Sequence, residues 1–456
     1  MTAQRRRAVV IGGVRTPFVK AFAEFMRLDT IALGVAAVRG LLDRYPVPRR
    51  EIGAVIWGGV ILPAYAPNVG REIVLDLSRE GRLDPEIEAL TVTRACASGL
   101  QAVTLAAGAI ERGDADLVIA GGSDSTSNAE VKLPQKLVHA AAPFVFGKPT
   151  ASDVLGALGQ LWPPGDLLPR APRVAERTTG QVMGEAAEEM ARRNEISRAA
   201  QDEFAVRSHH RAAAAIAAGR FAGEVVPVAA PAGDGSGAGH GGNASQRNHD
   251  GEQVVHADTL VRAATSVDKL ARLAPAFAKV GTITAGSSSP LTDGAAAVLL
   301  ASAERAAALG LTPLARVSHW SYVGVDPADQ LLIGPALAMP RCLARAGLRL
   351  DEIDLVDMHE AFAAQVLSVL RMLASSAFAR TRLGRDTAVG TVDPARLNVH
   401  GGSLALGHPF AATGARMVTT MASELHATGK RTALLGLCAA GGLGAAALLE
   451  NAASQS

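Results

Sequence analysis

The chain contains few cysteines, few aromatic residues and no long apolar run. Three of its 456 residues are cysteine, and they are too far apart for a disulfide framework or a Cys-x-x-Cys metal pair. No apolar run reaches the roughly 18 residues of a membrane-spanning helix. The apolar run after Arg5-Arg6-Arg7 ends too early for a signal peptide. We therefore expect a cytoplasmic protein that binds no metal.

Charge of either sign is not in excess. The chain has 45 basic and 43 acidic residues, for a net charge of +2. Without a basic patch that carries interleaved aromatics, this balance predicts no nucleic-acid partner. Hydrophobic residues make up 48% of the chain, as in closely packed α/β proteins. Apolar strands alternate with helical patterns, which predicts parallel sheets that helices cover on both faces.

Two segments recur and suggest two similar halves. Residues 50–55 resemble residues 351–356, and the helix, Gly and strand around Gly113 resemble those around Gly429. We predict an N-terminal half of residues 1–123 plus about 270–308, and a C-terminal half of residues 309–456. Residues 124–269 interrupt the pattern and predict an inserted loop or lid domain, with a flexible tract at 231–253.

Cys96 lies where a predicted strand, residues 90–93, gives way to a predicted helix that Gly113 closes. A helix N-terminus favours negative charge, so it should lower the pKa of the thiol and favour the nucleophilic thiolate. We interpret Cys96 as a candidate nucleophile. The alternative is a small buried residue, because free cysteines are often buried.

Three further turns combine reactive side chains with a glycine-rich backbone, and they carry His359, His408 and Cys438. A histidine within reach of a thiol can act as its general base. If the two halves are similar, their strands end close together and these turns converge with Cys96. A helix cap, a strand-end residue and a tight turn remain the structural alternatives. The run at Gly12-Gly13 lacks the spacing of a dinucleotide site. The run at Gly441–Gly444 could mimic such a loop, but only 12 residues follow Gly444, too few for the acidic ribose partner expected about 20 residues on. We therefore expect no nicotinamide-dependent oxidoreductase.

These segments resemble the thiolase family of acetyl-CoA C-acyltransferases. The matching segments follow the family's order: Cys96-Ala-Ser-Gly99, Met183-Gly184, Thr284-Ala-Gly286 with Ser289 and Asp293-Gly294, His359-Glu-Ala-Phe362, Gly407-His-Pro409 and Cys438–Gly444. Typical members have Asn at the position of His359 and Gly at that of Ala440. The forms found here most resemble the β-subunit of the trifunctional enzyme of fatty-acid oxidation and its bacterial counterpart. The resemblance implies an α/β fold of duplicated βαβαβαββ halves in a five-layered αβαβα arrangement, with an inserted loop domain.

The resemblance also implies a reaction, the CoA-dependent thiolytic cleavage of a 3-ketoacyl-CoA to acetyl-CoA and a shortened acyl-CoA. This reversible Claisen condensation would serve fatty-acid β-oxidation. By resemblance, His408 activates Cys96, which carries the acyl group, and Cys438 is the general acid. The N–H groups of Cys96 and Ala440 form one oxyanion hole, and His359 and His408 stabilise the enolate oxygen.

The same resemblance places Ser289 and Met183 beside CoA, and Phe362 beside the substrate. It implies no bound cofactor, because CoA is a substrate. It also implies a homodimer or tetramer, with a hydratase/dehydrogenase α-subunit as a further partner. The alternatives are a biosynthetic acetoacetyl-CoA thiolase, a condensing enzyme like the ketoacyl synthases and, as a non-enzyme, an acyl-CoA-binding scaffold. Cys438 at the last turn favours a thiolase over a synthase, which resembles a Cys-His-His arrangement.

Apolar residues in the insertion leave several interpretations open. We expect Phe144-Val145-Phe146 and Leu161-Trp162 on loops. Ordinary packing is the simplest interpretation, and an acyl tunnel or contact with a membrane or a partner are the others. His209 and His210 lack a convincing metal-ligand spacing, and we expect them on the surface.

Overall fold

The computed structural model of the chain describes residues 6–131, 133–161, 175–231, 245–247 and 253–455. The chain forms two compact units, of which the larger comprises Met1–Asn128 with Glu176–Ser456 and the smaller comprises Ala129–Ala175. The domain boundaries predicted from the sequence remain a prediction.

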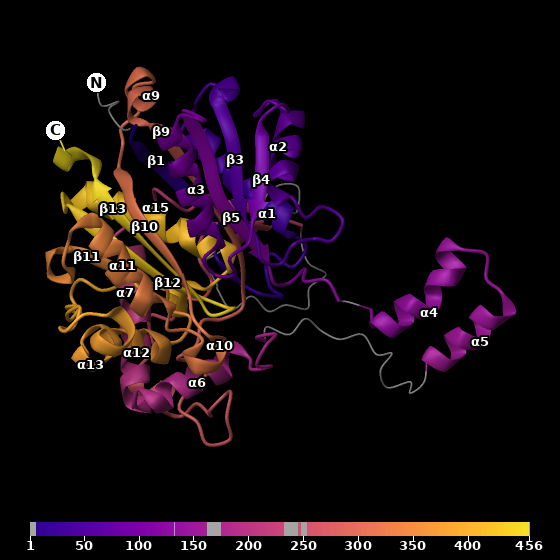
Figure 1. Ribbon diagram of the computed structural model, residues 1–456. Helices are drawn as coiled ribbons and strands as arrows, with labels where there is room; N and C mark the ends of the chain where they lie inside the picture. The colour runs from indigo at the N-terminus through magenta and orange to yellow at the C-terminus, as the bar shows by residue number, and fades with distance from the viewer. Residues whose placement is uncertain (1–5, 132, 162–174, 232–244, 248–252, 456) are drawn as a thin grey trace. The chain divides into compact units, whose positions relative to one another are not determined.

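A ten-stranded mixed sheet organises the larger unit (Figure 1). Its strands are β1 Ala8–Arg15, β2 Val19–Lys20, β3 Ile52–Gly58, β4 Glu88–Val92, β5 Leu117–Ser125, β9 Thr292–Ser302, β10 Ala315–Gly324, β11 Leu355–Met358, β12 Thr432–Ala439 and β13 Leu443–Asn451. The strand order is β11-β12-β13-β10-β1-β9-β5-β3-β4, and β2 pairs with β9.

The expectation of parallel sheets is wrong for much of this sheet. Only the pairs β3–β4, β3–β5 and β11–β12 are parallel among the named strands of the sheet. The others are antiparallel, as in β12–β13 and β5–β9. The reason is clearest at β12 and β13, which three residues join. Such a short connection makes a hairpin, whereas a parallel pair needs a crossover.

The strand order confirms the duplication. From the middle of the sheet outward, one half has the strand order β1-β9-β5-β3-β4, and the other has the matching order β10-β13-β12-β11. In the second half, Leu397 bridges Val356 of β11 in parallel, where β4 lies beside β3 in the first. The two recurring sequence segments lead into equivalent strands, β3 with β11 and β5 with β12.

Helices cover both faces of each half and complete a five-layered arrangement. The main helices are α1 Thr30–Arg44, α2 Val69–Arg79, α3 Ser98–Arg112, α11 Gly334–Ala346, α12 Ala363–Leu373 and α15 Ala411–Thr428. One apolar cluster joins α1 and α2 to the N-terminal strands, and another joins α11 and α12 to the C-terminal strands. A third encloses α3 and α15 between the inner faces of both halves. Neighbouring residues such as Leu434 and Leu435 therefore enter different clusters, as strand alternation requires.

The central helices α3 and α15 cross at two glycines. A Cβ on Gly99 would lie 2.1 Å from the carbonyl oxygen of Ala411, and one on Gly414 would lie 2.4 Å from the nitrogen of Leu100. Backbone thus packs directly on backbone at this crossing. Because α3 follows Cys96 and α15 follows His408, the crossing sets the separation of these two side chains.

Gly414→Ala should therefore both destabilise the protein and impair its activity. Overpacking of this kind costs about 1–3 kcal/mol, and moving α15 away from α3 separates His408 from Cys96. Thermal unfolding and the steady-state rate of the purified variant test this expectation. Gly108→Ala on α3 is the matched control, because the new methyl group would meet only the flexible end of Arg112. A Gly414→Ala protein as stable and active as Gly108→Ala would contradict it.

The segment between the halves contains both helices and strands. Its elements in the larger unit are α6 Met183–Arg193, α7 Arg198–Ala217, α8 Val267–Ala271 and a small sheet of β6 Val228–Ala230, β7 Ser245–Arg247 and β8 Gln253–Val255. The tract predicted to be flexible is therefore a strand at β7, while residues 232–244 and 248–252 lie outside the described residues. Shorter helices elsewhere are α9 Ala303–Ala308, α10 Pro327–Gln330, α13 Ser376–Phe378 and α14 Ser403–Leu406.

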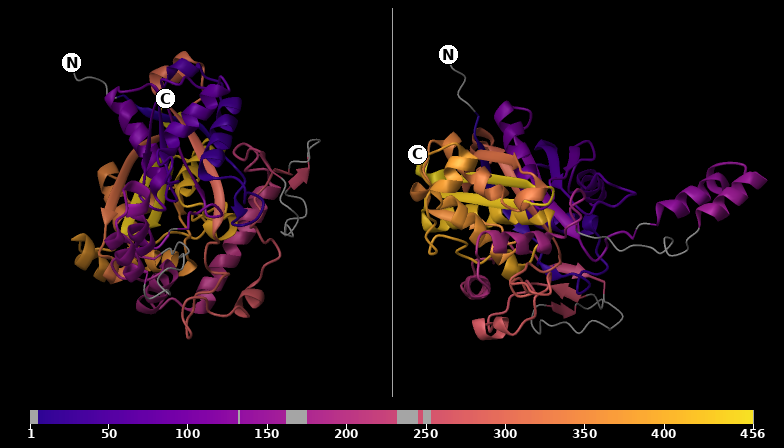
Figure 2. Two further views of the ribbon diagram at one scale, coloured as in Figure 1. Left: turned by 90° about the vertical axis from the view of Figure 1, so that its right-hand side faces the viewer. Right: turned by 60° about the horizontal axis from the view of Figure 1, so that its bottom comes forward.

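The smaller unit is a pair of helices, α4 Gln135–Phe146 and α5 Ala151–Gln160, which lie side by side (Figure 2). Phe144, Val145 and Phe146 end α4, so the expectation of a loop is wrong there. Leu161 directly follows α5, and Trp162 lies outside the described residues. In the described part of the chain, no helix combines the length and the hydropathy needed to cross a membrane.

Candidate active site

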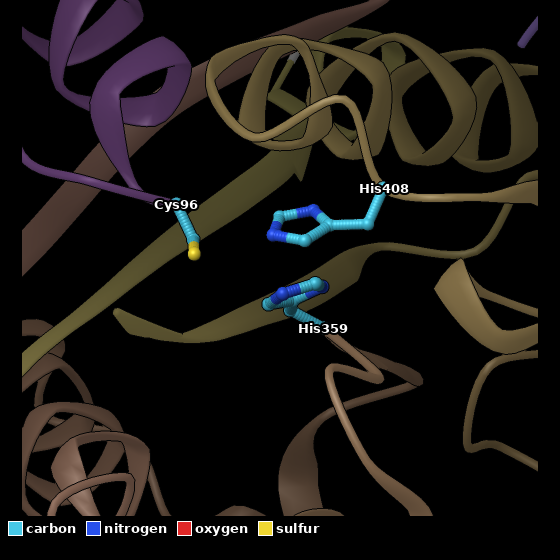
Figure 3. A group of neighbouring side chains, drawn as sticks. All are labelled: Cys96, His359 and His408. Carbon is cyan, nitrogen blue, oxygen red and sulfur yellow. The ribbon is translucent and has the colours of Figure 1, made fainter. Parts of the chain in front are cut away.

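Three side chains from the two halves of the fold meet in one place (Figure 3). Cys96 follows β4, His359 follows β11, and His408 lies between α14 and α15. One sulfur or nitrogen atom from each of Cys96, His359 and His408 lies within 4.8 Å of the others. The two imidazole rings have centroids 4.1 Å apart. Sulfur and two nitrogens are also ligands that zinc accepts, but the same three groups serve equally for nucleophilic and acid–base chemistry.

Cys96 occupies a tight turn between β4 and α3. The preceding Ala95 has a φ of 44°, which residues with a side chain rarely adopt. Ser98 stabilises this turn, because its Oγ accepts the N–H of Arg94 at 2.7 Å and donates to the carbonyl of Ala95 at 2.6 Å. The strained turn and its hydrogen bonds fix the direction of the Cys96 side chain.

Hydroxyl groups orient the two histidines. Nδ1 of His359 pairs with Oγ of Ser403 at 2.9 Å, and Nδ1 of His408 pairs with Oγ1 of Thr413 at 2.7 Å. Both Nε2 atoms are buried and have no hydrogen-bond partner among the described residues. They are therefore available to a substrate. Sequence reasoning missed both hydroxyl partners, although Thr413 follows His408 by five residues in the same loop-to-helix segment.

Both imidazoles are neutral near pH 7. Burial lowers the pKa of His408 to about 3, and the positive charge of Arg416 acts in the same direction. Burial also lowers the pKa of His359 well below its ordinary value, with His408 and Arg416 contributing. A neutral imidazole accepts a proton, so either Nε2 atom is suited to the role of a base.

The expected low pKa of Cys96 is wrong. Burial raises its pKa to about 11 and outweighs the backbone N–H groups of Ala440 and Cys96 itself, which lower it. Cys438 is buried at the end of β12, and burial together with the neighbouring Cys96 sulfur raises its pKa well above the ordinary value. The resting site thus holds two thiols and two neutral imidazoles.

This protonation state predicts how Cys96 reacts with iodoacetamide in the free enzyme. Only the thiolate is alkylated, so the rate should keep rising with pH toward about 11, the pKa of this thiol. The rate at each pH is measured by mass spectrometry of the Cys96 peptide, with the Cys438 peptide read in parallel. A rate that is already constant between pH 6 and 8 would show a preformed thiolate–imidazolium pair and contradict the expectation.

The backbone around Cys438 supplies hydrogen-bond donors. The N–H of Ala440 approaches the Cys96 sulfur closely enough to lower its pKa. Gly441 and Gly442 follow with φ values of 81° and 65° and turn the chain into β13. An N–H group that points at the attacking sulfur is also placed near the oxygen of a carbonyl that this sulfur attacks.

Of the residues predicted to bind substrate, Ser289 and Phe362 lie close together, and Met183 and Phe362 both belong to or pack against the C-terminal apolar cluster. Ser289 is half-buried, and its N–H donates to the carbonyl of Ala361 at 2.9 Å. The Phe362 ring is buried and contacts the edge of Phe277, with centroids 5.8 Å apart. Met183 is half-buried at the start of α6 and packs, like Phe277, against the C-terminal apolar cluster. Their roles toward a substrate remain predictions.

Two buried carboxylates that sequence reasoning missed brace this region. Asp124 accepts N–H groups from Val60, Ile61 and Ala411, the last at 2.8 Å. Glu360 accepts hydrogen bonds from Ser208 and Asn398, both at 2.6 Å, and from the N–H of Leu404. Glu360 lies within the family-matching segment His359–Phe362, but no local sequence pattern predicts the contacts of either carboxylate.

His209 is buried, contrary to the surface position expected for it. Its Nδ1 accepts the N–H of Arg262 at 3.2 Å, and burial lowers its pKa to about 4. It faces the protein because it lies on the inner side of α7, while the adjacent His210 is exposed.

Comparison with known proteins gives matches along nearly the whole chain. Two family models match, "Thiolase, N-terminal domain" at residues 8–304 and "Thiolase, C-terminal domain" at residues 311–451. Similar relatives include the 3-ketoacyl-CoA thiolases of Shewanella halifaxensis and Aeromonas salmonicida, at 40% and 41% identity over 98% of each chain.

Solved structures are similar over the same extent. The acetyl-CoA acetyltransferase of Bacillus anthracis has a TM-score of 0.79 and 30% identity, over 98% of this chain and 99% of that one. Human mitochondrial 3-ketoacyl-CoA thiolase has a TM-score of 0.78 and 28% identity, over 98% and 100%. A structure of the human enzyme in complex with CoA has a TM-score of 0.76, with 28% identity over 98% of each chain.

Proposed function

Because the chain belongs to the thiolase family, we propose that it cleaves 3-ketoacyl-CoA with CoA to give acetyl-CoA and a shortened acyl-CoA. The observation that carries the proposal is the meeting of Cys96, His359 and His408 within 4.8 Å. The full-length relatives named 3-ketoacyl-CoA thiolases support the same substrate class. Coenzyme A enters as a substrate, and the reaction needs no bound cofactor.

The first half-reaction forms an acyl-enzyme. Nε2 of His408 takes the proton of the Cys96 thiol, while its Nδ1–H donates to Thr413. The sulfur attacks the 3-keto carbon, and the N–H groups of Cys96 and Ala440 donate to the resulting oxyanion. The bond between carbons 2 and 3 then breaks, and its electron pair passes into an acetyl-CoA enolate.

The enolate is then protonated, and the acyl group is transferred. His359 and the imidazolium of His408 donate hydrogen bonds to the enolate oxygen, and the thiol of Cys438 supplies a proton to carbon 2. Acetyl-CoA leaves, and a second CoA gives its thiol proton to Cys438 as its sulfur attacks the thioester. The bond from the carbonyl carbon to Cys96 then breaks, the shortened acyl-CoA leaves, and the imidazolium of His408 returns a proton to the Cys96 thiolate. The condensation direction uses the same groups in reverse, with the Cys438 thiolate as base.

A substrate panel tests this function. Acetoacetyl-CoA, 3-ketodecanoyl-CoA and 3-ketohexadecanoyl-CoA are each incubated with CoA, and acetyl-CoA is measured by chromatography. We expect cleavage of all three, with kcat/KM for the longer substrates at least equal to that for acetoacetyl-CoA. If no substrate gives acetyl-CoA, the proposed thiolytic activity is wrong, and an acyl-CoA-binding scaffold is the interpretation that remains.

A biosynthetic acetoacetyl-CoA thiolase is the second candidate. Its support is the structural similarity to an acetyl-CoA acetyltransferase. The same panel separates it from the first, because such an enzyme would act on acetoacetyl-CoA alone. A decarboxylating condensing enzyme is disfavoured by Cys438, which lies beside Cys96 where an acid–base thiol is needed.

We also propose a homodimer or tetramer in the cytoplasm, with a hydratase/dehydrogenase subunit as a partner in β-oxidation. The last strand in the sheet order, β4, supports self-association, because an edge strand offers unpaired backbone groups. The smaller unit supports contact with a membrane surface through exposed apolar residues, of which Phe146 is 88% exposed and Leu155 72%. The molar mass from light scattering tests the oligomeric state, and sedimentation with lipid vesicles tests the membrane contact.

A further inference from the structure

Glu176 contacts the turn that follows the candidate oxyanion hole. It is the first residue of the larger unit after the excursion Ala129–Ala175, and it is only 8% exposed. Its Oε2 accepts the N–H of Gly441 at 3.0 Å, and its Oε1 accepts the hydroxyl of Thr178 at 3.0 Å. The contact spans 265 residues of sequence, and none of the reaction steps above uses this carboxylate.

The turn that Glu176 contacts can change its backbone conformation easily, because it contains two consecutive glycines. Gly441 and Gly442 both have positive φ, so their peptide groups have few side-chain constraints. The far side of the turn is fixed, because the carbonyl of Gly442 accepts the N–H of Val325 at 2.7 Å. The near side joins Ala440, whose N–H points at the sulfur of Cys96. Glu176 constrains this near side.

We propose that Glu176 is a positioning residue for the oxyanion hole, an inference that rests on the proposed function. Its carboxylate fixes the peptide plane between Ala440 and Gly441, leaving only the two soft dihedrals of Ala440 between that plane and the donating N–H. The charged hydrogen bond is strong because it is shielded from water. Glu176 thereby holds the Ala440 N–H in line with the oxygen that develops negative charge when Cys96 attacks.

Two reactions of Cys96 separate positioning from a general structural role. Acyl transfer from a simple acyl-CoA passes through a tetrahedral oxyanion and needs the Ala440 N–H. Alkylation by iodoacetamide displaces iodide and forms no oxyanion. Losing an oxyanion donor outright costs about 10²–10³ in rate, so its misalignment in Glu176→Ala should slow acyl transfer by roughly 10–100-fold. KM for the acyl-CoA should change by less than about threefold. The alkylation rate should fall less than the acyl-transfer rate, because this donor affects alkylation only through the pKa of the Cys96 thiol.

The experiment measures both reactions by intact-protein mass spectrometry on the full chain. Glu176→Gln keeps an oxygen that accepts from Gly441, and it should restore most of the acyl-transfer rate. Glu203→Ala, at an exposed position on α7, is the control for carboxylate removal and should match the unmodified protein in both reactions. An unchanged acyl-transfer rate in Glu176→Ala, or an equal fall in both reactions, would overturn the proposal. If the unmodified protein forms no acyl-enzyme at all, the proposed function itself fails, which is a distinct result.

Discussion

Cys96→Ala is expected to lower thiolysis by at least about 10⁴-fold, because loss of a covalent nucleophile removes the acyl-enzyme route altogether. The change deletes one sulfur atom from a half-buried position, so folding and CoA-ester binding should persist. Steady-state release of acetyl-CoA gives the rate, calorimetric titration with an acyl-CoA gives the binding, and mass spectrometry shows whether any acyl adduct forms.

Cys342→Ala is the matched control. Cys342 is buried in α11, where its thiol contacts the carbonyl of His319, and it lies outside the site. This variant should lose some stability and keep its turnover. Retained thiolysis in Cys96→Ala, or an acyl adduct on Cys438 in its place, would contradict the nucleophile assignment.

Cys438→Ala should separate the two chemistries of the site. Acyl transfer from a simple acyl-CoA to Cys96 needs no proton at carbon 2, and Cys438 would only protonate the departing CoA thiolate, which is a good leaving group. The rate of acyl transfer should therefore fall far less than the rate of cleavage. Cleavage of a 3-ketoacyl-CoA needs the proton at carbon 2, and its rate should fall by about 10²–10⁴-fold, the usual contribution of a general acid. Condensation of two acetyl-CoA molecules should fall in parallel, because the same thiolate would be its base.

Rapid-quench mass spectrometry follows both reactions in one preparation. Adduct formation from acetyl-CoA reports the first reaction, and acetyl-CoA release from acetoacetyl-CoA reports the second. Equal losses in both would mean that Cys438 supports the structure of the site rather than transferring a proton.

Much of the framework was readable from local sequence patterns. The predicted helix after Cys96 is α3, and Gly113 closes it as its C-cap with a φ of 84°, because glycine adopts positive φ readily. The turn predicted at Cys96 lies between β4 and α3. The recurring segments indicated two halves, and the strand orders of those halves agree. These features depend on residues close together in sequence, where periodicity and glycine positions are informative.

Features that depend on residues far apart in the sequence could not be predicted from local sequence patterns. The helix N-terminus suggested a low pKa for Cys96, but packing from both halves raises it to about 11. The Ser403 and Thr413 hydroxyls that orient the histidines show no distinguishing pattern. Glu176 is 265 residues from the glycine that it contacts. Burial and long-range pairing decide each of these, and neither is encoded in a short window.

The way the sheet is assembled delays the onset of activity during synthesis. Strand β1 pairs with β9 and β10, which follow it by nearly three hundred residues, and pairing over such separations is slow to form. The nucleophile comes from one half, and both imidazoles come from the other. A ribosome must translate past residue 408 before base and thiol can coexist, and past 438 before a proton donor exists. An unfinished chain would therefore not react with the CoA thioesters of the cell.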